Sequence, residues 1–332
     1  MPPRISVLIP CFNHGAYIDE AVTSVLNQSY QDFEIVIVDD GSTDAGTREA
    51  LDRLNRPRTT VLTTANRGLP GARNFAARHA AGEFYCALDA DDKLAPTWFE
   101  QAVRVLDQQP AVAFVSHWLE TFGDERWTWT PERCDLPALL ARNAVNGAAL
   151  VRRQAFDAVG GYDEAMTEGC EDWDLWLRLV ESGRQGTIIP EVLFFYRRRA
   201  DSMSRRMLDA QAYRRPLEVL VQKHEVSYRA HLPAVLVVKE AEVLHLTREI
   251  ADLERDRLTT LEPALRRARE ELAATREKKT RLQAVRVREE EQERLAWKAA
   301  ELERQISDLH ASWSWRITAP LRKLYALLGG GR

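Results

Sequence analysis

The chain has 332 residues, a length that suits about two domains rather than one. Its formal net charge of −4 excludes the basic footprint that a duplex nucleic-acid partner usually leaves. The four cysteines form no Cys-x-x-Cys pair, so the sequence indicates neither a zinc knuckle nor a redox pair and suits a reducing compartment. We expect no signal peptide, and no stretch has the roughly 18 uninterrupted apolar residues of a membrane-spanning helix.

Short apolar runs alternate with amphipathic segments up to about residue 205. Residues 5–9 and 33–38 are rich in β-branched side chains and predict two buried strands. Between them, Ile18, Val22 and Val25 have the spacing of a helix face. The same patterns predict further strands at 61–63, 84–88 and 112–115, and a helix at 71–81. This alternation predicts an α/β fold with a mostly parallel sheet, in which ligands bind at the carboxyl ends of the strands.

The chain after residue 205 is expected to be helical. Apolar residues step by three and four from 258 to 282 and again, after a phase shift, from 295 to 313, which is a heptad pattern. Pro263 must start, kink or break a helix. If residues 263–312 form one helix, it is a rod of about 75 Å. Its length and polarity favour self-association as a coiled coil over the alternative, a charged helix that packs on its own domain.

The last residues, 313–332, combine one apolar stripe with basic side chains, and no acid occurs from 311 onward. Trp315 and Tyr325 add amphipathic aromatic rings to this segment. The pattern is typical of a helix that lies in a lipid interface. A terminal helix that caps the coiled coil or packs on a partner fits the residues equally well.

Acidic side chains follow two of the predicted strands. Asp39 and Asp40 end the second strand and could accept hydrogen bonds from a nucleobase or ribose, although Asp is also an ordinary turn residue. Asp89, Asp91 and Asp92 directly follow the fourth strand, where three acids are costly unless they are solvated, paired or bound to a cation. Hard divalent cations prefer carboxylate oxygens, so this cluster could hold a metal that neutralises a diphosphate, or it could be an Asp-rich turn.

Two further segments carry candidate functional groups. Residues 169–179 have helical spacing with Glu171 and Asp172 in the first turn, where a carboxylate could act as a general base or simply complement the helix dipole. Residues 196–204 combine arginines with serines, which could grip phosphate oxygens or form a solvated basic run. Each segment has an ordinary structural explanation by itself, whereas their order along the chain is specific.

That order starts with Pro10-Cys11-Phe12-Asn13 after the first strand and includes Asn-Arg-Gly-Leu-Pro-Gly-Ala-Arg-Asn at 66–74. Over residues 4–205 it resembles the family 2 glycosyltransferases of the GT-A fold. The resemblance implies a nucleotide-sugar-binding, Rossmann-like domain with a mixed central sheet, followed here by the α-helical coiled-coil region. It also implies an inverting, metal-dependent transfer of a sugar from a nucleoside-diphosphate sugar, with UDP as the usual nucleotide of the family.

The resemblance assigns roles to individual residues. Asp172 matches the catalytic base, and Glu171 would position hydroxyl groups. Mn²⁺ or Mg²⁺ would be bound by Asp91, with Asp89 as a further ligand and Asp92 as a further ligand or a ribose contact. The donor would be contacted by Pro10, Phe12, Asp39, Asp40, Asn66, Gly68, Arg73, Asp89, Arg197, Arg199, Ser202 and Ser204. Arg199 departs from the family pattern, in which His is common, and it can bind phosphate but offers no neutral imidazole.

Residues 312–322 are similar to the Ser-Trp-Arg-x-Thr-x-Pro-Leu-Arg tails that follow coiled coils in bacterial enzymes of O-antigen and other surface-polysaccharide synthesis. This similarity favours the membrane-surface interpretation of the tail and implies a glycan or lipid-linked glycan acceptor. We therefore expect a glycosyltransferase domain at 1–205, a helical linker at 206–262, a coiled coil at 263–312 and a basic amphipathic tail at 313–332.

The expected protein is thus a cytoplasmic, homo-oligomeric glycosyltransferase, peripheral on the inner face of the cytoplasmic membrane and without a nucleic-acid partner. One alternative is a catalytically silent nucleotide- or glycan-binding scaffold of a polysaccharide assembly complex. A nucleotidyltransferase is less favoured, because the Gly-rich loop with Arg or Lys that usually follows the first strand in that class is absent here.

Overall fold

The computed structural model describes residues 2–199, 210–267 and 279–311. Ser202, Ser204 and the tail at 313–332 lie outside these ranges. The described residues divide into two compact units. The first contains the residues up to 199 together with Pro216–His231, and the second contains residues 210–215 and those from Leu232 onward. Part of the segment expected to be a linker therefore belongs to the first unit.

A mixed sheet forms the centre of the first unit. Its nine described strands have the order β3-β2-β1-β4-β8-β6-β9-β5, and β7 pairs with β6. β3, β2, β1 and β4 are parallel, β8 is antiparallel to both of its neighbours, β6 and β9 are parallel, and β5 is antiparallel to β9. The strands are β1 (Ile5–Cys11), β2 (Phe33–Asp39), β3 (Thr59–Thr63), β4 (Phe84–Ala87), β5 (Lys93–Leu94), β6 (Val112–Gly123), β7 (Thr128–Trp129), β8 (Leu150–Arg152) and β9 (Gln185–Arg198).

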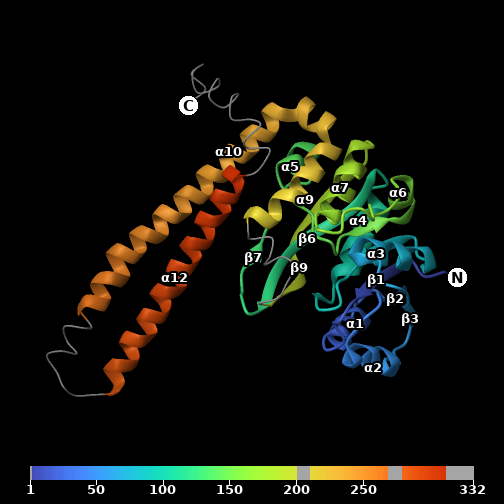
Figure 1. Cartoon of the computed structure of the whole chain (residues 1–332), viewed down its shortest axis with the longest axis horizontal. Coiled ribbons are helices and arrows are strands. Elements are labelled where there is room, and N and C mark those ends of the chain that lie inside the picture. The colour runs from blue at the N-terminus through green and yellow to red at the C-terminus, as the bar shows by residue number, and fades with distance from the viewer. Residues whose placement is uncertain (1, 200–209, 268–278, 312–332) are drawn as a thin grey trace. The chain divides into compact units, whose positions relative to one another are not determined.

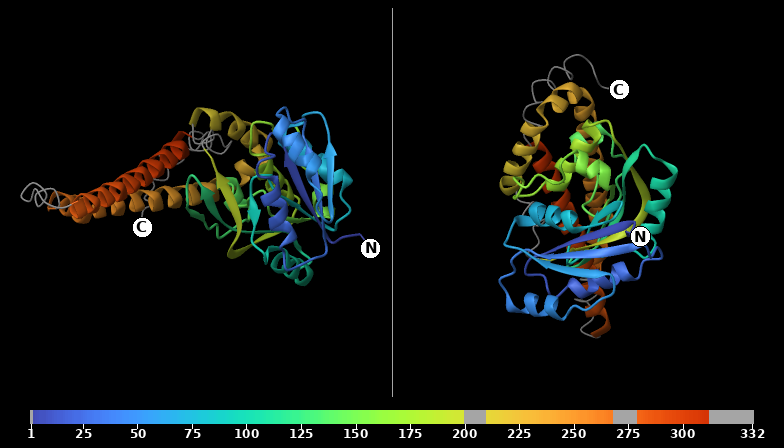
Figure 2. Two further views of the ribbon diagram at one scale, coloured as in Figure 1. Left: turned by 90° about the horizontal axis from the view of Figure 1, so that it is seen from below. Right: turned by 90° about the vertical axis from the view of Figure 1, so that its right-hand side faces the viewer.

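Helices cover both faces of the parallel strands, as Figure 1 and Figure 2 show. α1 and α4 contribute to the apolar cluster on one face, and α3 packs on β1 and β2. The helices of the first unit up to residue 199 are α1 (Ile18–Leu26), α2 (Ala45–Arg53), α3 (Gly68–His79), α4 (Trp98–Gln108), α5 (Leu136–Ala141), α6 (Arg153–Ala158) and α7 (Glu171–Glu181). Because both faces are covered, every residue of β1 is buried, which explains its uninterrupted apolar run.

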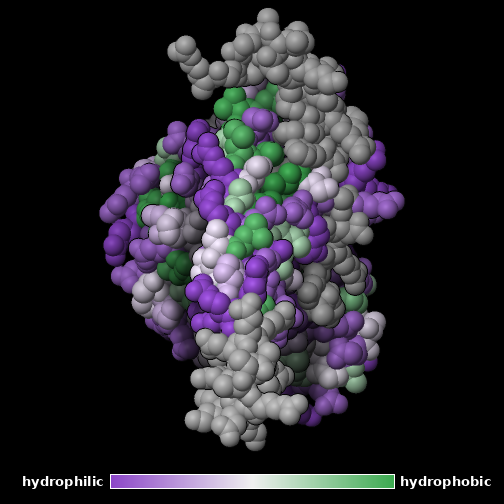
Figure 3. Space-filling view, turned by 90° about the vertical axis from the view of Figure 1, so that its left-hand side faces the viewer, coloured by the Kyte–Doolittle hydropathy of each residue, from purple (hydrophilic) through white to green (hydrophobic). Residues whose placement is uncertain are grey.

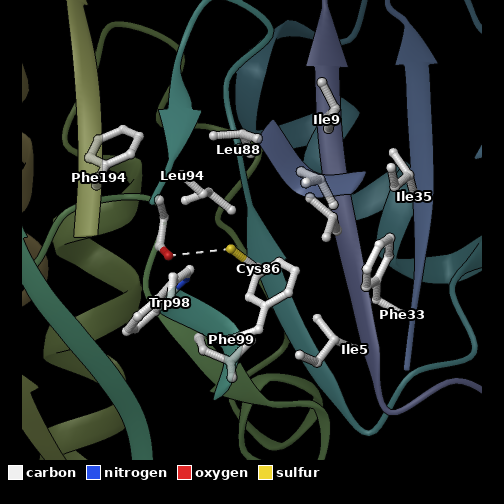
Figure 4. Packing of buried hydrophobic residues seen from close by; sticks show 14 of the residues in the cluster. Ile5, Ile9, Phe33, Ile35, Cys86, Leu88, Leu94, Trp98, Phe99 and Phe194 are labelled. Carbon is white, nitrogen blue, oxygen red and sulfur yellow. Dashed lines mark hydrogen bonds between the residues drawn. The ribbon is translucent and has the colours of Figure 1, made fainter. Parts of the chain in front are cut away.

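The main apolar core lies between the sheet and the helices α1 and α4. Trp98 and Phe99 of α4 are fully buried there, and the Phe99 ring meets the Phe33 ring edge-on at 6.0 Å between centroids. Figure 4 shows Phe99 beside Ile5, and Phe33 beside Ile35 on the neighbouring strand. The buried positions of α4 recur every three to four residues, so its helical spacing alone turns one apolar face to the sheet. This core holds the strand ends that carry the acids in fixed positions.

The structure confirms the predicted α/β class and the mixed sheet, and it extends the predicted elements. The strand expected at 112–115 continues to Gly123, because its second half alternates between buried and partly exposed positions and pairs with both β9 and β7. The sequence analysis missed the strands β5, β7, β8 and β9. β5 and β7 have two residues each and β8 has three, so they are too short to show a periodic pattern.

The long helices of the chain are α9 (Ala210–Lys223), α10 (Glu225–Asp256) and α12 (Lys279–Ala311), and the π-helical turn η1 (Arg257–Leu261) follows α10. In the second unit, Lys298 of α12 pairs with Glu249 of α10 at 3.2 Å. A cavity of about 160 Å³ is lined by residues from α10, η1 and α12, among them Leu253 and Leu295. α10 and α12 therefore lie side by side in the second unit. The rod predicted for 263–312 includes residues 268–278, which lie outside the described residues.

Pro263 lies in the first turn of the helical segment 262–267, which agrees with one of the predicted options, and a π-helical turn precedes this segment. Glu262 donates its backbone amide to the Arg257 carbonyl, and the π-helical turn that results ends just before the proline. Proline has no amide hydrogen to donate to a helical hydrogen bond, which explains why the turn next to it is widened. No helix of the described part of the chain is long and apolar enough to cross a membrane. The molecular face in Figure 3 shows hydrophobic residues interspersed among hydrophilic ones.

Candidate active site

The candidate site lies at the carboxyl ends of the parallel strands. Cys11 at the end of β1 is in register with Asp39 at the end of β2, and Asp39 is in register with Thr63 at the end of β3. The backbone amide of Asp40 donates to the Cys11 carbonyl at 2.9 Å. The segments that follow three strands therefore meet at one edge of the sheet, where ligands bind in folds of this class.

Asp39 and Asp40 make different contacts within this edge. Asp39 Oδ1 accepts a hydrogen bond from the backbone amide of Ser42 at 2.9 Å and so closes the turn after β2. Asp40 is 3% exposed, and its Oδ1 accepts from the backbone amide of Arg67 at 2.8 Å. Burial raises the pKa of Asp40, and the backbone amides of Arg67 and Gly68 oppose that rise. The two carboxylates thus fix the loops after β2 and β3 relative to each other.

The predicted donor residues Pro10, Phe12, Asn66 and Gly68 all lie at this edge. Pro10 is buried in β1, whereas Phe12 just beyond the strand is 41% exposed and leaves ring surface for a planar ligand. Asn66 Oδ1 accepts from the Gly68 amide at 3.2 Å at the start of α3. Gly41 has φ +73°, and a Cβ at that position would lie 2.8 Å from the Asn66 nitrogen, so the close approach of the two loops requires glycine.

Arg73 of α3 links the two predicted acid clusters. Its Nη2 donates to Asp89 Oδ1 at 2.7 Å and its Nη1 donates to Glu171 Oε1 at 2.8 Å. The Arg73 side chain is 4% exposed, and its guanidinium carbon lies 5.3 Å from the centroid of the Tyr162 ring. Asp89, just after β4, and Glu171 of α7 therefore share one buried cation. In this structure Arg73 pairs with carboxylates of the protein itself.

We expect Arg73→Met to destabilise the fold by about 3 kcal/mol, because it leaves Glu171 without its cation in a buried position and Asp89 in a partly buried one. The measurement is urea unfolding at neutral pH. Arg78→Met is the matched control on the same helix, since Arg78 is 53% exposed and only 3.7 Å from Glu164. The Arg78→Met control should lower the free energy of unfolding by less than about 1 kcal/mol. Equal losses in the two variants would contradict a buried, charge-balancing role for Arg73.

Asp172 lies in the first turn of α7. Its Oδ1 accepts from the backbone amide of Trp173 at 2.7 Å, and its Oδ2 accepts from Asn143 Nδ2 at 3.2 Å. Burial, followed by the neighbouring charge of Glu171, raises the pKa of Asp172 to about 7. The helix begins after Cys170, which has φ 64°, an uncommon left-handed conformation for this residue type. A carboxyl group with a pKa near neutrality is suited to take a proton from a hydroxyl group.

Asp91 lies beside a basic and aromatic group of residues. Asp91 Oδ2 pairs with Arg199 Nη1 at 3.1 Å, and Arg199 Nη2 lies 3.0 Å from His14 Nε2. The Arg199 guanidinium stacks 5.0 Å from the centroid of Tyr17. Burial, followed by repulsion from Asp89, raises the pKa of Asp91. The raised pKa indicates that the Asp91 carboxylate is under-compensated and would gain from a further positive charge.

Asp92 is 1% exposed and anchors the end of β9. Its Oδ1 accepts from the backbone amide of Arg197 at 2.7 Å, while its Oδ2 has no hydrogen-bond partner among the described residues. Burial raises the pKa of Asp92 well above its usual range. The Arg197 side chain donates to the Asp91 carbonyl at 2.8 Å and to Glu20 Oε2 at 2.9 Å. Arg197 therefore holds β9 against the acid cluster and α1.

The described residues contain no preformed group of three metal-ligating side chains. In this structure Asp89 pairs with Arg73, Asp91 pairs with Arg199, and Asp92 accepts a hydrogen bond from the Arg197 amide, so each of the three acids has a partner. Mg²⁺ is usually held by one or two carboxylates plus substrate phosphates rather than by a complete protein cage. The unpartnered Asp92 oxygen and the under-compensated Asp91 carboxylate fit such a site, in which a bound diphosphate completes the coordination.

The structure thus brings the predicted residues of the described range to one edge of the sheet and adds partners that the sequence analysis missed. Asn143 is the side chain that contacts Asp172 from another element, and nothing in its local sequence distinguishes it. His14 and Tyr17 flank Arg199. Their place just after the first strand is the one signal that could have indicated them.

Two family models match this chain. The model "Glycosyl transferase family 2" matches residues 6–161, and the model "Glycosyltransferase like family 2" matches residues 126–232. A similar curated protein is the putative glycosyltransferase EpsE of Bacillus subtilis, with 28% identity over 263 residues that cover 71% of this chain and 92% of EpsE. The matches to several other curated relatives cover between 19% and 62% of the lengths of those relatives.

Solved structures show the same fold. The chain is similar to residues 1–349 of TarS from S. aureus in complex with UDP-GlcNAc, with a TM-score of 0.54 and 20% identity over 66% of each chain. It is also similar to the mannosyltransferase PcManGT from Pyrobaculum calidifontis in complex with GDP-Man and Mn²⁺, with a TM-score of 0.57 and 22% identity over 94% of this chain and 88% of that one. The fold, the acidic residues at the strand ends and the two family models agree. The chain belongs to the family 2 glycosyltransferases.

Proposed function

We propose that this enzyme transfers a sugar from a nucleoside-diphosphate sugar to a hydroxyl group, with inversion at the anomeric carbon and Asp172 as the general base. The observation that carries the proposal is the state of Asp172, whose pKa is raised to about 7 in the first turn of α7. A base with this pKa is largely ionised above neutral pH and can still accept a proton effectively. The nucleotide sugars bound to the structurally similar TarS and PcManGT support the choice of donor class.

The donor is proposed to bind at the carboxyl ends of β1, β2 and β3. Phe12 offers an exposed ring to the base, and Asp40 offers a carboxylate held in place by the Arg67 amide. Asp39, Asn66 and Gly68 shape the loops around that carboxylate, with Pro10 beneath them. Arg199, and Ser202 and Ser204 beyond the described range, are proposed to contact the diphosphate.

A divalent metal is proposed to be held by Asp91, with Asp89 and Asp92 next to it. When bound, Mn²⁺ or Mg²⁺ supplies positive charge that offsets the charge of the diphosphate. Arg199 sits on Asp91 at 3.1 Å and is proposed to leave that carboxylate for the donor phosphates when donor binds. The Mn²⁺ in the PcManGT complex supports a metal for this chain.

The proposed chemistry is a single displacement. Asp172 takes the proton of the acceptor hydroxyl as its oxygen forms a bond to the anomeric carbon of the donor sugar. The bond between that carbon and the diphosphate oxygen breaks at the same time, and the nucleoside diphosphate leaves with the electron pair. Asn143 and the Trp173 amide hold the Asp172 carboxylate during this step, and Arg73 keeps Glu171 in place beside it.

The cellular setting is a further proposal that rests on the sequence. A lipid-linked or other glycan acceptor in bacterial surface-polysaccharide synthesis follows from the similarity of the tail at 312–322 to tails of such enzymes. We propose that the tail binds the inner face of the cytoplasmic membrane and that the helix pair of the second unit self-associates. Exposed Leu258 and Trp297 give that pair apolar surface for a second copy.

The donor class can be tested by thermal stabilisation of the full chain, since residues 216–231 belong to the unit that carries the site. UDP, GDP and dTDP are added with and without Mn²⁺. A ligand at 100 times its Kd stabilises the folded state by about 2.7 kcal/mol, which is a shift of about 5–10 °C for a domain of this size. We expect one nucleotide to give such a shift only with Mn²⁺. No shift with any of them would favour a silent scaffold.

A further inference from the structure

A second buried charge network lies on α7, two residues after Asp172. Asp174 is fully buried, and it pairs with Arg178 Nη2 at 2.7 Å, Lys223 Nζ at 2.7 Å and His224 Nε2 at 3.1 Å. Burial by itself would raise the pKa of Asp174. Hydrogen bonds from His224 and Lys223, with the charge of Arg178, outweigh burial and hold that pKa at about 2. Asp174 is therefore ionised across the working pH range and needs its cations.

Two of these partners lie after residue 205, within residues 126–232 that the second family model matches. Lys223 ends α9 and also pairs with Asp163 at 2.5 Å. His224 reaches Asp174 through Nε2 and Glu181, the last residue of α7, through Nδ1 at 2.8 Å. Both ring nitrogens face carboxylates, so both bonds are made only by the doubly protonated ring, and these two acids raise the pKa of His224 against the opposing effect of burial.

The segment Pro216–His231 also contributes apolar side chains to the interior of the first unit. Its residues Leu217, Leu220, Val221 and Tyr228 are buried within the first unit. His224 contacts both ends of α7, because Asp174 lies in the first turn of this helix and Glu181 is its last residue. Arg178, between them, donates to the carbonyls of Val159 and Gly161 at 2.6 Å each and ties the helix to the loop before it.

The first turn of α7 is also held through Glu171, which pairs with Arg73, and through Asp172, which contacts Asn143. The helix begins after Cys170, which has a left-handed conformation and whose side chain caps none of the helix amides. Asp172 and Asp174 share this turn, so a small rotation of the helix moves both carboxylates together. A displacement of about 1 Å at a catalytic group can cost about 100-fold in rate.

We propose that Lys223 and His224 are positioning residues for catalysis, which hold the first turn of α7 through Asp174 and Glu181 so that Asp172 meets the acceptor hydroxyl. This inference rests on the proposed role of Asp172. It gives the segment after residue 205 a direct part in the reaction, apart from any role of the long helices in association.

The test compares His224→Ala and Lys223→Ala with Arg229→Ala in the full chain. Arg229 is 79% exposed in the same segment and pairs only with Glu225 on the surface among the contacts described, so it is the matched control. We expect kcat to fall at least tenfold in the first two variants, while the donor KM and the Kd of the nucleotide change less than twofold. Lys223→Arg, which keeps the cation, should recover kcat to within about threefold of wild type.

Two results would overturn the proposal: kcat within twofold of wild type in His224→Ala, or a parallel loss of kcat and nucleotide affinity, which a merely structural role would produce. If His224→Ala does not fold, Lys223→Ala, which removes the other cation at Asp174, is judged by the same criteria. The role of Asp172 is tested separately by Asp172→Asn. An inactive Asp172→Asn beside a fully active His224→Ala would refute only the positioning role, whereas an active Asp172→Asn would refute the proposed function itself.

Discussion

Asp172→Asn is expected to lower sugar transfer by about 10²–10⁴-fold while nucleotide binding stays unchanged, because the substitution removes a general base and little else. Asparagine keeps the size of the side chain and an oxygen that can accept from the Trp173 amide. The measurement is kcat for transfer beside the Kd of the nucleotide with Mn²⁺. Asp157→Asn, at an exposed position on α6, is the control and should leave both values unchanged.

The pH dependence of the wild-type enzyme belongs to the same prediction. The pKa of Asp172 is raised to about 7, so the base loses its proton as the pH rises through neutrality. Turnover should therefore fall about tenfold per unit below pH 7 and level off above it. A profile that stays flat between about pH 5.5 and 8.5, or an Asp172→Asn variant that turns over like wild type, would show that another group takes the proton.

Asp91→Ala is expected to abolish the Mn²⁺-dependent part of nucleotide binding and to lower transfer by about 10³-fold, since a metal on a diphosphate contributes several kcal/mol. The fold should tolerate the change, because the raised pKa of Asp91 indicates that its buried charge is poorly compensated without a metal. The measurement is the thermal shift with and without Mn²⁺ at saturating nucleotide.

Asp52→Ala, at an exposed position on α2, serves as the control for the metal. It should keep the full Mn²⁺-dependent shift. If Asp91→Ala keeps that shift too, the metal ligand must be sought elsewhere in the acid cluster, and Asp92, with its unpartnered buried oxygen, is the next candidate.

The sequence predicted the framework of the site well because its signals are local. Apolar runs that end in Asp39-Asp40 and in Asp89-Ala90-Asp91-Asp92 mark strand ends, and parallel strands bring such ends to one edge. The start of α7 at Glu171 is likewise visible in the apolar spacing that follows it. The positions of these acids at the strand ends could therefore be predicted without knowledge of tertiary contacts.

The contacts of those acids could not be predicted, because they join segments far apart in the chain. Arg73 meets Glu171 across 98 positions, and Arg197 meets Asp92 across 105. No local sequence pattern distinguishes an arginine that binds a substrate from one that pairs with buried carboxylates of the protein. The same holds for His224, whose partners on α7 lie 43 and 50 positions away.

The partner of the predicted coiled-coil helix could not be predicted for a related reason. Its heptad spacing is real, but an apolar seam is satisfied equally by a second chain and by another helix of the same chain. The pairing of Lys298 with Glu249 reveals the second solution within the described residues. Only the outer, exposed apolar positions of the pair remain for the association with a second copy that we propose.

The most direct test of the proposed reaction is the release of nucleoside diphosphate from a panel of UDP-, GDP- and dTDP-sugars by the full chain with Mn²⁺, measured for wild type and Asp172→Asn side by side. We predict release from sugars of one nucleotide by the wild type, at a rate that Asp172→Asn lowers at least 100-fold. Equal rates in the two proteins, or no release from any donor, would contradict a transfer reaction with Asp172 as its base.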